Sequence, residues 1–337
     1  MSENEWVVPD PLVDRFGRVH RSLRVSVTDR CNLRCTYCMP AVHPEFVQRD
    51  KLLSYEEIDR VVGVLSERCG IRQLRITGGE PLVRRDLPTL LRLLSNRQTV
   101  TDFAMTTNAI ALTPNMARDL VGAGLNRINI SLDTLHPERF KQVTRRDALE
   151  ATLRGIAVAN EHFETVKLNA LAISGLDESE IFSLTEFALQ HGMPLRFIEF
   201  MPLDADESWQ RSAVVDGETI LATLRRRYPD LRQVPRTRSS EPAETFAIGD
   251  GTVGIIRSVS QPFCGSCDRL RLTADGSLRN CLFAHDETPL RQMLRDGCSD
   301  DAIVHHAMSC VAAKKRSHGM DEESFRPPQR PMYAIGG

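Results

Sequence analysis

The sequence has no run of 18 apolar residues, and a membrane-spanning helix needs about that length. Its opening residues, MSENEWVVPD, lack the apolar stretch of a secretory signal peptide. These absences predict a cytoplasmic protein with no membrane partner. An excess of positive charge is missing too, because 43 Lys and Arg are balanced by 45 Asp and Glu. The chain is therefore not built to coat nucleic acid.

Lysine is scarce, so arginine must do most of any anion binding. Only five of the 43 cationic residues are lysines. They are Lys51, Lys141, Lys167, Lys314 and Lys315. The planar guanidinium of arginine suits the oxygens of a phosphate. Lys167 lies inside the apolar segment TVKLNALAI, where a buried strand avoids a charge unless a carboxylate or a ligand faces it.

Nine cysteines in a cytoplasmic protein are not a disulfide framework, and their clustering suggests metal. They form two groups of three and three scattered residues. The first group is Cys31, Cys35 and Cys38, and the second is Cys264, Cys267 and Cys281. The scattered residues are predicted to be small hydrophobic side chains on helices, and they are Cys69, Cys298 and Cys310.

Short apolar segments alternate with longer helical patterns from residue 20 to about residue 200. The predicted strands cover residues 22–28, 71–77, 101–107, 125–133, 165–173 and 194–202. The predicted helices cover 54–69, 86–95, 114–124, 147–162 and 178–192, and Ser54 and Glu57 could form a capping box at the first. This alternation predicts an α/β fold with a parallel sheet. Because six units are too few for an eight-unit barrel, we expect an open, partial parallel β/α barrel or a doubly wound sheet.

The pattern changes in the last third of the chain. Residues 203–243 are polar and contain one predicted helix, 217–228. Short strands are then predicted at 244–248 and 252–259, followed by the second cysteine group and two final helices. We therefore predict a partial-barrel domain over residues 1–240 and an α+β cysteine-bearing region over residues 241–337.

Small and polar residues gather where the predicted strands end. TGGEP (77–81) follows the second strand, and TTN (106–108) ends the third. SLD (131–133) ends the fourth strand and EFMP (199–202) the sixth. The chemistry of parallel β/α folds lies at the carboxyl ends of the strands. We expect these residues and the first cysteine group to share one site.

The spacing Cys31-x3-Cys35-x2-Cys38 places three thiols in one tight loop. Three thiolates can hold three irons of a [4Fe–4S] cluster, which leaves the fourth iron open to bind and activate a ligand. A zinc loop or three unligated cysteines remain alternatives on spacing alone. The second group, Cys264-x2-Cys267-x13-Cys281, leaves the choice between a cluster and zinc undecided in the same way. Zinc held by these cysteines and His285 is chemically reasonable.

The first group, with Tyr37 before its third cysteine and TGGEP after the next strand, resembles the radical S-adenosylmethionine (SAM) superfamily. The resemblance implies that the open iron chelates SAM, whose cleavage gives a 5′-deoxyadenosyl radical that abstracts hydrogen. It also implies a set of SAM contacts in this sequence. They are Tyr37, Gly78, Gly79, Glu80, Ser131 and Met201.

The segment DRLRLTADGSLRN, between the last two cysteines, predicts a hairpin with its turn at ADG. Arg269 and Arg271 alternate with Leu270 and Leu272, so both guanidinium groups share one face of a strand. Such a face is commonly solvated. It could also face a ligand, because these arginines closely follow Cys267.

Over nearly its whole length, the chain resembles the GTP 3′,8-cyclase family of molybdenum cofactor biosynthesis, from RSLRVSVTDRCNLRCTYCMP through GSCDRLRLT to the final GG. The resemblance implies two [4Fe–4S] clusters, with guanine of GTP on the open iron of the second. It implies hydrogen abstraction from ribose C3′ and attack on guanine C8. The implied substrate contacts are Arg24, Arg75, Thr106, Lys167, Arg269, Leu270 and Arg271.

The C-terminal tail, RPPQRPMYAIGG, has no packing pattern, and an untethered tail is the expectation from its residues alone. The family resemblance implies instead that Gly336 and Gly337 insert toward the active site and are needed for catalysis. It further implies a flavodoxin- or ferredoxin-like electron donor, cyclic pyranopterin monophosphate synthase as the next enzyme, and, by analogy, a homodimer. The alternatives are another radical SAM enzyme with an auxiliary cluster, acting on a peptide or nucleoside, and a non-catalytic iron–sulfur electron carrier.

Overall fold

The computed structural model of the chain describes residues 9–320 and 322–336. Its central feature is a run of six parallel strands, each joined to the next through helical segments. These strands are β1 (Ser22–Ser26), β2 (Gln73–Thr77), β3 (Asp102–Thr107), β4 (Arg127–Ser131), β5 (Thr165–Ala172) and β6 (Leu195–Glu199). The six predicted strands are therefore all present, one to four residues shorter than expected.

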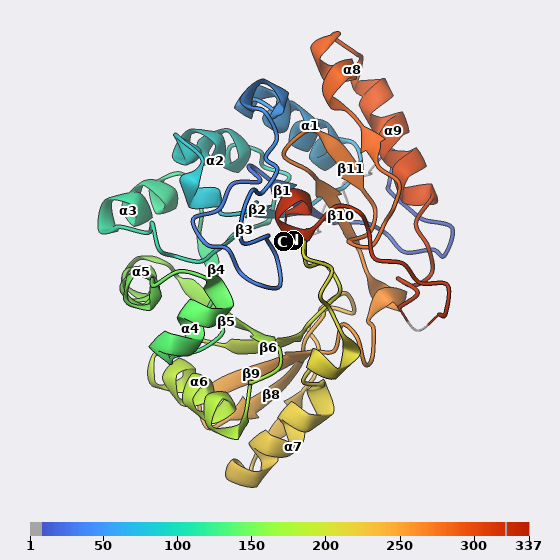
Figure 1. Cartoon of the computed structure of the whole chain (residues 1–337). Helices are drawn as coiled ribbons and strands as arrows, with labels where there is room; N and C mark the ends of the chain where they lie inside the picture. The colour runs from blue at the N-terminus through green and yellow to red at the C-terminus, as the bar shows by residue number, and fades with distance from the viewer. Residues whose placement is uncertain (1–8, 321, 337) are drawn as a thin grey trace, which may run out of the picture.

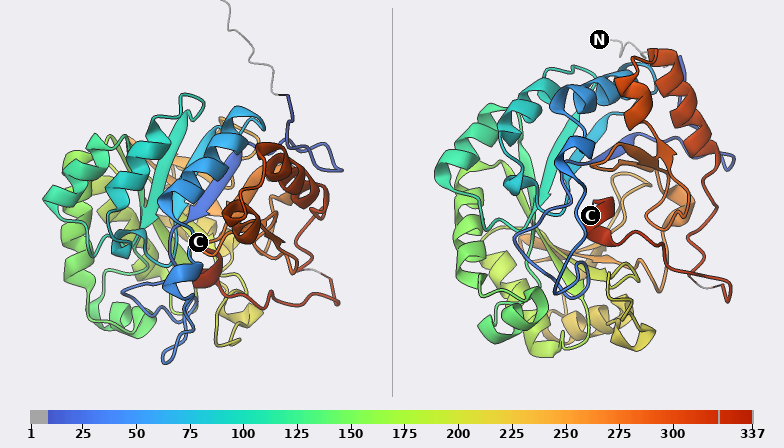
Figure 2. Two further views of the ribbon diagram at one scale, coloured as in Figure 1. Left: turned by 90° about the horizontal axis from the view of Figure 1, so that it is seen from above. Right: turned by 45° about the horizontal axis from the view of Figure 1, so that its top comes forward.

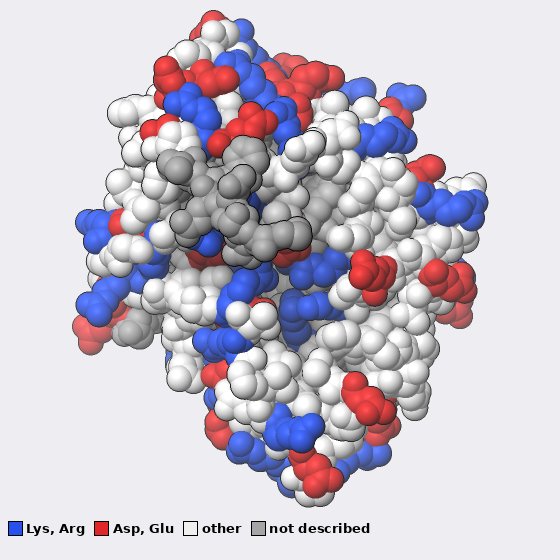
Figure 3. Space-filling model, turned by 180° about the vertical axis from the view of Figure 1, so that it is seen from behind, with Lys and Arg blue, Asp and Glu red and all other residues white. Residues whose placement is uncertain are grey.

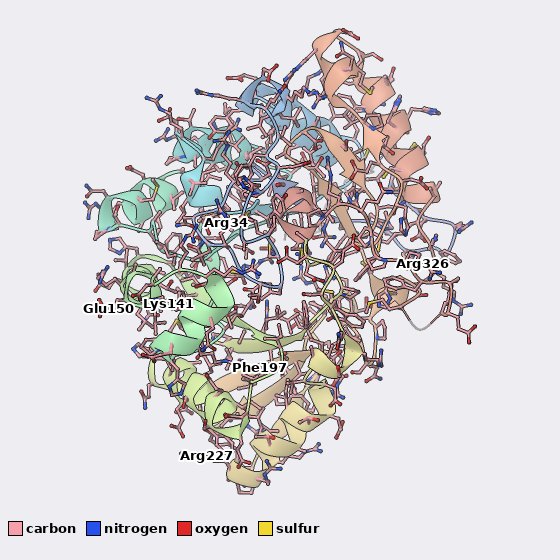
Figure 4. The ribbon with its side chains drawn as sticks, viewed as in Figure 1. Arg34, Lys141, Glu150, Phe197, Arg227 and Arg326 are labelled. Carbon is pink, nitrogen blue, oxygen red and sulfur yellow. The ribbon has the colours of Figure 1, made fainter. Side chains whose placement is uncertain are left out.

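Helices cover the outer face of this sheet (Figures 1 and 2). They are α1 (Tyr55–Glu67), α2 (Leu87–Ser95), α3 (Pro114–Gly122), α4 (Pro137–Thr144), α5 (Leu149–His162), α6 (Glu178–Gln190) and α7 (Gly217–Arg227). Glu150 on α5 and Arg227 on α7 lie in this outer layer, whereas Arg34, on the loop after β1, lies nearer the middle of the molecule (Figure 4). The main apolar core fills the space between sheet and helices.

Residues from the last third of the chain extend both ends of the sheet. The hairpin β8 (Glu244–Ile248) and β9 (Gly251–Ile256) joins beside β6, and β7 (Arg232–Val234) pairs with β8. At the opposite end, β10 (Arg269–Leu272) pairs in parallel with β1, and β11 (Ser277–Arg279) and β12 (Thr288–Pro289) follow. The twelve-stranded sheet runs from β12 to β7 and does not close, which confirms the open, partial barrel.

The C-terminal helices are α8 (Arg291–Arg295), α9 (Asp300–Ala312) and the short α10 (Met332–Ile335). The predicted division after residue 240 falls between β7 and β8, which pair with each other, and it remains a prediction. Within the described residues, no helix has both the length and the apolar character needed to cross a bilayer.

Local signals in the sequence account for several helix starts, where a side chain caps the first turn. Ser54 and Glu57 form the expected capping box at the start of α1.

The helix α4 was not expected, because only Phe140 and Thr144 of its eight residues are buried and its apolar pattern is weak. The cysteine prediction was wrong in part. Cys310 is on α9, but Cys69 follows the end of α1 and Cys298 lies in the short connection between α8 and α9.

Candidate functional site

The concave side of the barrel holds one cavity of about 420 Å³, within the usual range for small-molecule sites. Both cysteine groups line this cavity, although more than 220 residues separate them in the chain. The predicted residues that line it are Arg24, Cys31, Cys35, Tyr37, Cys38, Arg75, Gly78, Gly79, Glu80, Thr106, Ser131, Lys167, Met201, Cys264, Cys267, Arg269, Arg271 and Cys281. The fold thus brings the expected SAM contacts, and all of the expected GTP contacts except Leu270, into one space.

The first cysteine group lies on the loop after β1, where its sulfurs are in an environment suited to metal ligation. The backbone N–H of Leu33 lies 3.4 Å from Sγ of Cys31, and the side-chain amide of Asn108 lies 3.8 Å from it. Burial raises the pKa of the Cys31 thiol to about 11 and that of Cys38 to about 12. Deprotonation therefore needs a strong counter-charge, which bound iron provides. Three thiols on one loop, with N–H donors beside Cys31, are a donor set that fits a cluster.

The TGGEP segment packs directly against the backbone that leads into Cys31. Gly79 N–H donates to Thr28 O at 2.7 Å, and Glu80 N–H donates to Arg30 O at 2.8 Å. A Cβ on Gly79 would lie 2.6 Å from the carbonyl oxygens of Asp29 and Arg30. Glycine is therefore required by contact with this chain, whereas the sequence had suggested only close approach of a ligand.

Glu80 is only 1% exposed and ties the segment after β2 to the end of β3. Its carboxylate accepts hydrogen bonds from Thr107 Oγ1 at 2.6 Å, Asn108 N at 2.7 Å and Leu82 N at 3.0 Å. Burial raises the pKa of Glu80, and these donors oppose that effect by stabilising the carboxylate. Glu80 also borders the cavity, and its backbone N–H bond to Arg30 O helps to position the cluster loop.

Tyr37 reaches across the cavity to a residue that the sequence reasoning did not single out. Its hydroxyl donates to Oδ2 of Asp133 at 2.6 Å, and Oδ1 of Asp133 accepts from Leu171 N at 2.8 Å. The aromatic residue before the third cysteine thus fastens the cluster loop to the ends of β4 and β5. The only advance signal was the position of Asp133 in the segment SLD that ends the fourth strand.

A cationic surface lines the part of the cavity formed by the strands. Arg271, Arg24 and Arg75 are consecutive register partners across β10, β1 and β2. Burial and the neighbouring cations Arg127 and Arg196 lower the pKa of Arg75 to about 9. Burial, with the same neighbours, lowers the pKa of Lys167 to about 8. Since like charges repel and desolvation disfavours each of them, the arrangement favours an anionic ligand.

Two of these cations, Arg127 and Arg196, were missed in the sequence. Each lines the cavity from its own strand, β4 or β6. Among the described residues, Nε of the buried Arg271 has no hydrogen-bond acceptor, which leaves a donor for a ligand. In the rear view, Lys and Arg side chains gather around a hollow near the middle of the molecule (Figure 3).

In the second cysteine group, Cys264 begins the short segment η4 (Cys264–Ser266) and Cys267 follows it. Cys281 lies two residues after the end of β11. Burial by itself raises the pKa of the Cys267 thiol, but the charges of Lys314 and Arg269 outweigh it and hold that pKa below its usual value. Cys267 is therefore suited to act as a thiolate ligand, whereas burial raises the pKa of the Cys264 thiol. His285 is exposed and does not line the cavity, so the zinc alternative lacks its proposed fourth ligand.

The expected hairpin is confirmed, with β10 antiparallel to β11. Arg269 and Arg271 line the cavity, while Leu270 and Leu272 are completely buried in the apolar core on the opposite face. The side chain of Leu270 therefore does not reach the cavity. A substrate contact at this position would have to come from its backbone, and it remains a prediction.

Comparison with known proteins decides the family. The family model of the radical SAM superfamily matches residues 25–188, and that of Molybdenum Cofactor Synthesis C matches residues 193–320. The GTP 3′,8-cyclase of Rhodopirellula baltica is 52% identical over 98% of this chain and 93% of its own length. That of Streptomyces coelicolor is 44% identical over 97% of this chain and 96% of its own. The chain belongs to the GTP 3′,8-cyclase family.

Solved structures share the fold of this GTP 3′,8-cyclase family member. Native anSMEcpe with bound AdoMet has a TM-score of 0.59 and 14% identity, covering 90% of this chain and 84% of that one. SuiB of Streptococcus suis bound to S-adenosylmethionine has a TM-score of 0.58 and 12% identity, covering 95% of this chain and 77% of that one. These likenesses concern the radical SAM fold alone.

The C-terminal tail of this family member is anchored, contrary to the expectation from its residues alone. Arg330 forms a bidentate ion pair with Asp275, at 3.0 and 2.6 Å, and Ile335 is only 1% exposed. The tail crosses to the middle of the open side, where α10 appears in red (Figure 2). A Cβ on Gly336 would lie 2.5 Å from Cβ of Ser26, so the tail reaches the end of β1. Gly337 lies outside the described residues.

Proposed function

We propose that this chain is a GTP 3′,8-cyclase, a radical SAM lyase that converts GTP to (8S)-3′,8-cyclo-7,8-dihydroguanosine 5′-triphosphate at the start of molybdenum cofactor biosynthesis. Its cofactors are SAM and two [4Fe–4S] clusters. The observation that carries the proposal is the near full-length identity to curated GTP 3′,8-cyclases. The cavity supports it, because two groups of three cysteines face a common space lined with cations.

Cys31, Cys35 and Cys38 would hold the first cluster. The SAM contacts would come from residues that border the cavity beside this loop, namely Tyr37, Gly78, Gly79, Glu80, Ser131 and Met201. Bound there, the first cluster and SAM would supply the radical chemistry that removes a hydrogen atom from ribose C3′ of GTP and leads to ring closure onto guanine C8. The chain itself holds the cluster loop in place through the backbone hydrogen bond from Glu80 N–H to Arg30 O and through the bond between Tyr37 and Asp133.

Cys264, Cys267 and Cys281 would hold the second cluster, on which guanine binds. The triphosphate carries about four negative charges and would lie against the cations of the sheet. Those we assign to it from the family pattern are Arg24, Arg75, Lys167, Arg269 and Arg271, with Thr106 beside them. The lowered pKa values of Arg75 and Lys167 support an anionic partner here, because such a partner relieves their mutual repulsion.

The tail would complete the active site from the open side. Met332 lines the cavity, and Tyr333 packs edge-on against Phe46 with ring centroids 6.2 Å apart. This position suits a role in excluding water from the radical chemistry. We assign Gly336 and Gly337 a part in catalysis on the family pattern, and the close packing of Gly336 against Ser26 supports it.

The cellular location, the electron donor, the next enzyme and the oligomeric state are proposed from the family. We propose a cytoplasmic enzyme whose electron donor is a flavodoxin- or ferredoxin-like protein. We propose that its product passes to cyclic pyranopterin monophosphate synthase, and that the enzyme is a homodimer. These three assignments rest on the family.

Transfer of deuterium tests the proposed function. Anaerobic, reduced protein is incubated with SAM and GTP deuterated at C3′, and the 5′-deoxyadenosine is analysed by mass spectrometry. Deuterium in that product, with formation of the cyclised nucleotide, is the expected result. SAM cleavage without deuterium transfer would point to another radical SAM substrate, and no cleavage at all would point to an electron carrier.

A further inference from the structure

Lys314, just after α9, points its side chain at the second cysteine group. It is only 3% exposed, whereas the adjacent Lys315 is exposed. The ammonium nitrogen of Lys314 lies 2.9 Å from the carbonyl oxygen of Arg269. It also lies 3.4 Å from the carbonyl oxygen of Cys267 and 3.5 Å from the sulfur of that residue. All three contacts therefore fall on the segment that carries one proposed cluster ligand.

No carboxylate within the described ranges forms an ion pair with Lys314. A buried ammonium is costly without a compensating negative charge. The two carbonyl oxygens accept its hydrogen bonds but carry no net charge. The sulfur of Cys267 is the remaining contact, and it supplies that charge only as a thiolate or as a ligand of an anionic cluster. The surroundings of Lys314 are thus built to face an anion at this sulfur.

The chain around Lys314 is also tied to the other two cysteines. Arg18 donates to Cys264 O at 2.6 Å and to Lys315 O at 2.7 Å, so one guanidinium joins the first ligand to the segment after α9. Its own position is fixed by an ion pair with Asp14 at 2.6 Å. Asn280, which precedes Cys281, donates to Cys310 O on α9 at 2.7 Å. The end of α9 therefore contacts the surroundings of all three ligands.

We propose that Lys314 is a positioning residue of the second cluster and its fixed positive counter-charge. The inference rests on the proposed assignment of that cluster to Cys264, Cys267 and Cys281. Hydrogen bonds to ligand sulfur and the local net charge set the reduction potential of an iron–sulfur cluster. Because reduction adds negative charge, the ammonium of Lys314 stabilises the reduced state and holds the potential at a more positive value.

The test compares Lys314→Met with Lys315→Met, its exposed neighbour. Iron content and the midpoint potential of each cluster, followed by electron paramagnetic resonance during a redox titration, are measured on anaerobically reconstituted protein. A Cys264/Cys267/Cys281→Ala variant identifies the signal of the first cluster. We expect Lys314→Met to shift only the second cluster to a more negative potential, and Lys315→Met to match the wild type. The variant Lys314→Arg, which keeps the charge, is expected to restore most of the wild-type potential.

Loss of the second cluster alone in Lys314→Met, with its return in Lys314→Arg, would also support the positioning role. An unchanged iron content and an unchanged second potential in Lys314→Met would overturn the inference and leave the proposed function intact. Wild-type protein that carries only the first cluster would overturn the second-cluster assignment itself, and this inference with it. The two failures are therefore distinguishable.

Discussion

Arg24 on β1 is the direct register partner of Arg271 on β10, so two guanidinium groups lie side by side on neighbouring parallel strands. Like charges at paired positions destabilise a sheet. Burial and the adjacent Arg269 lower the pKa of Arg271 to about 10, and burial with Arg271 lowers that of Arg24 as well. A bound polyphosphate would remove the repulsion between these two guanidinium groups, so the pair favours binding of such an anion.

Replacing Arg271 separates its binding role from any structural one. Each charge-assisted hydrogen bond contributes about 1.5–3 kcal/mol, so Arg271→Gln should weaken GTP binding about 10- to 100-fold. Thermal stability of the ligand-free protein should stay level or rise, because a repulsive neighbour of Arg24 is removed. Calorimetric titration and thermal melting check both. Arg154→Gln, at an exposed site on α5, is the control and should change neither. A destabilised Arg271→Gln with normal GTP affinity would refute this role.

The affinity for GTP should fall as pH rises through about 8, the lowered pKa of Lys167 in the free protein. The bound triphosphate favours the charged ammonium, so above that pH binding must take up a proton, and affinity drops by up to about tenfold per pH unit. Dissociation constants measured from about pH 7 to 9 check this. In Lys167→Arg the fall should begin at higher pH, while Lys141→Arg on α4 should follow the wild type. The same profile in Lys167→Arg would rule out this lysine as the titrating group.

Gly79→Ala should release the first cluster. The new Cβ would lie 2.6 Å from two backbone carbonyl oxygens next to Cys31, and backbone cannot yield as a flexible side chain can. We expect the variant to lose about half of the iron and to stop cleaving SAM. The control is Gly122→Ala, since a Cβ there meets nothing within 4 Å. Full iron content in Gly79→Ala would mean that the contact with residues 28–30 does not hold the cluster loop.

Gly336→Ala tests the docked tail. Gly336 has φ +91°, and its added Cβ would meet Ser26 Cβ at 2.5 Å and Oγ at 2.8 Å. Cyclisation should fall at least about tenfold while both clusters remain bound. Gly297→Ala is matched for backbone strain, at φ +74°, but has open space around it and should be nearly as active as the wild type. Deleting both terminal glycines should abolish cyclisation and spare the fold, and normal turnover by the truncated protein would refute the role of the tail.

The cysteines and TGGEP were recognisable from the sequence because each set of ligands or turns lies within one short segment. The parallel strands were predictable for a similar reason, since apolar runs form locally. Contacts between distant segments were not. Tyr37 and Asp133 are 96 residues apart, and Lys314 and Cys267 are 47 apart, so only the folded sheet pairs them. Arg127 and Arg196 were missed because strand register decides whether their side chains face the cavity, and the sequence does not reveal that register.

Metal analysis tests directly whether the chain holds two clusters. Iron, acid-labile sulfide and zinc are measured on protein purified without oxygen, for the wild type and for Cys264/Cys267/Cys281→Ala. The predicted result is about eight irons per chain in the wild type and about four in the variant, with matching sulfide. About four irons and one zinc in the wild type, with only the zinc lost in the variant, would contradict the claim that guanine binds a second open iron.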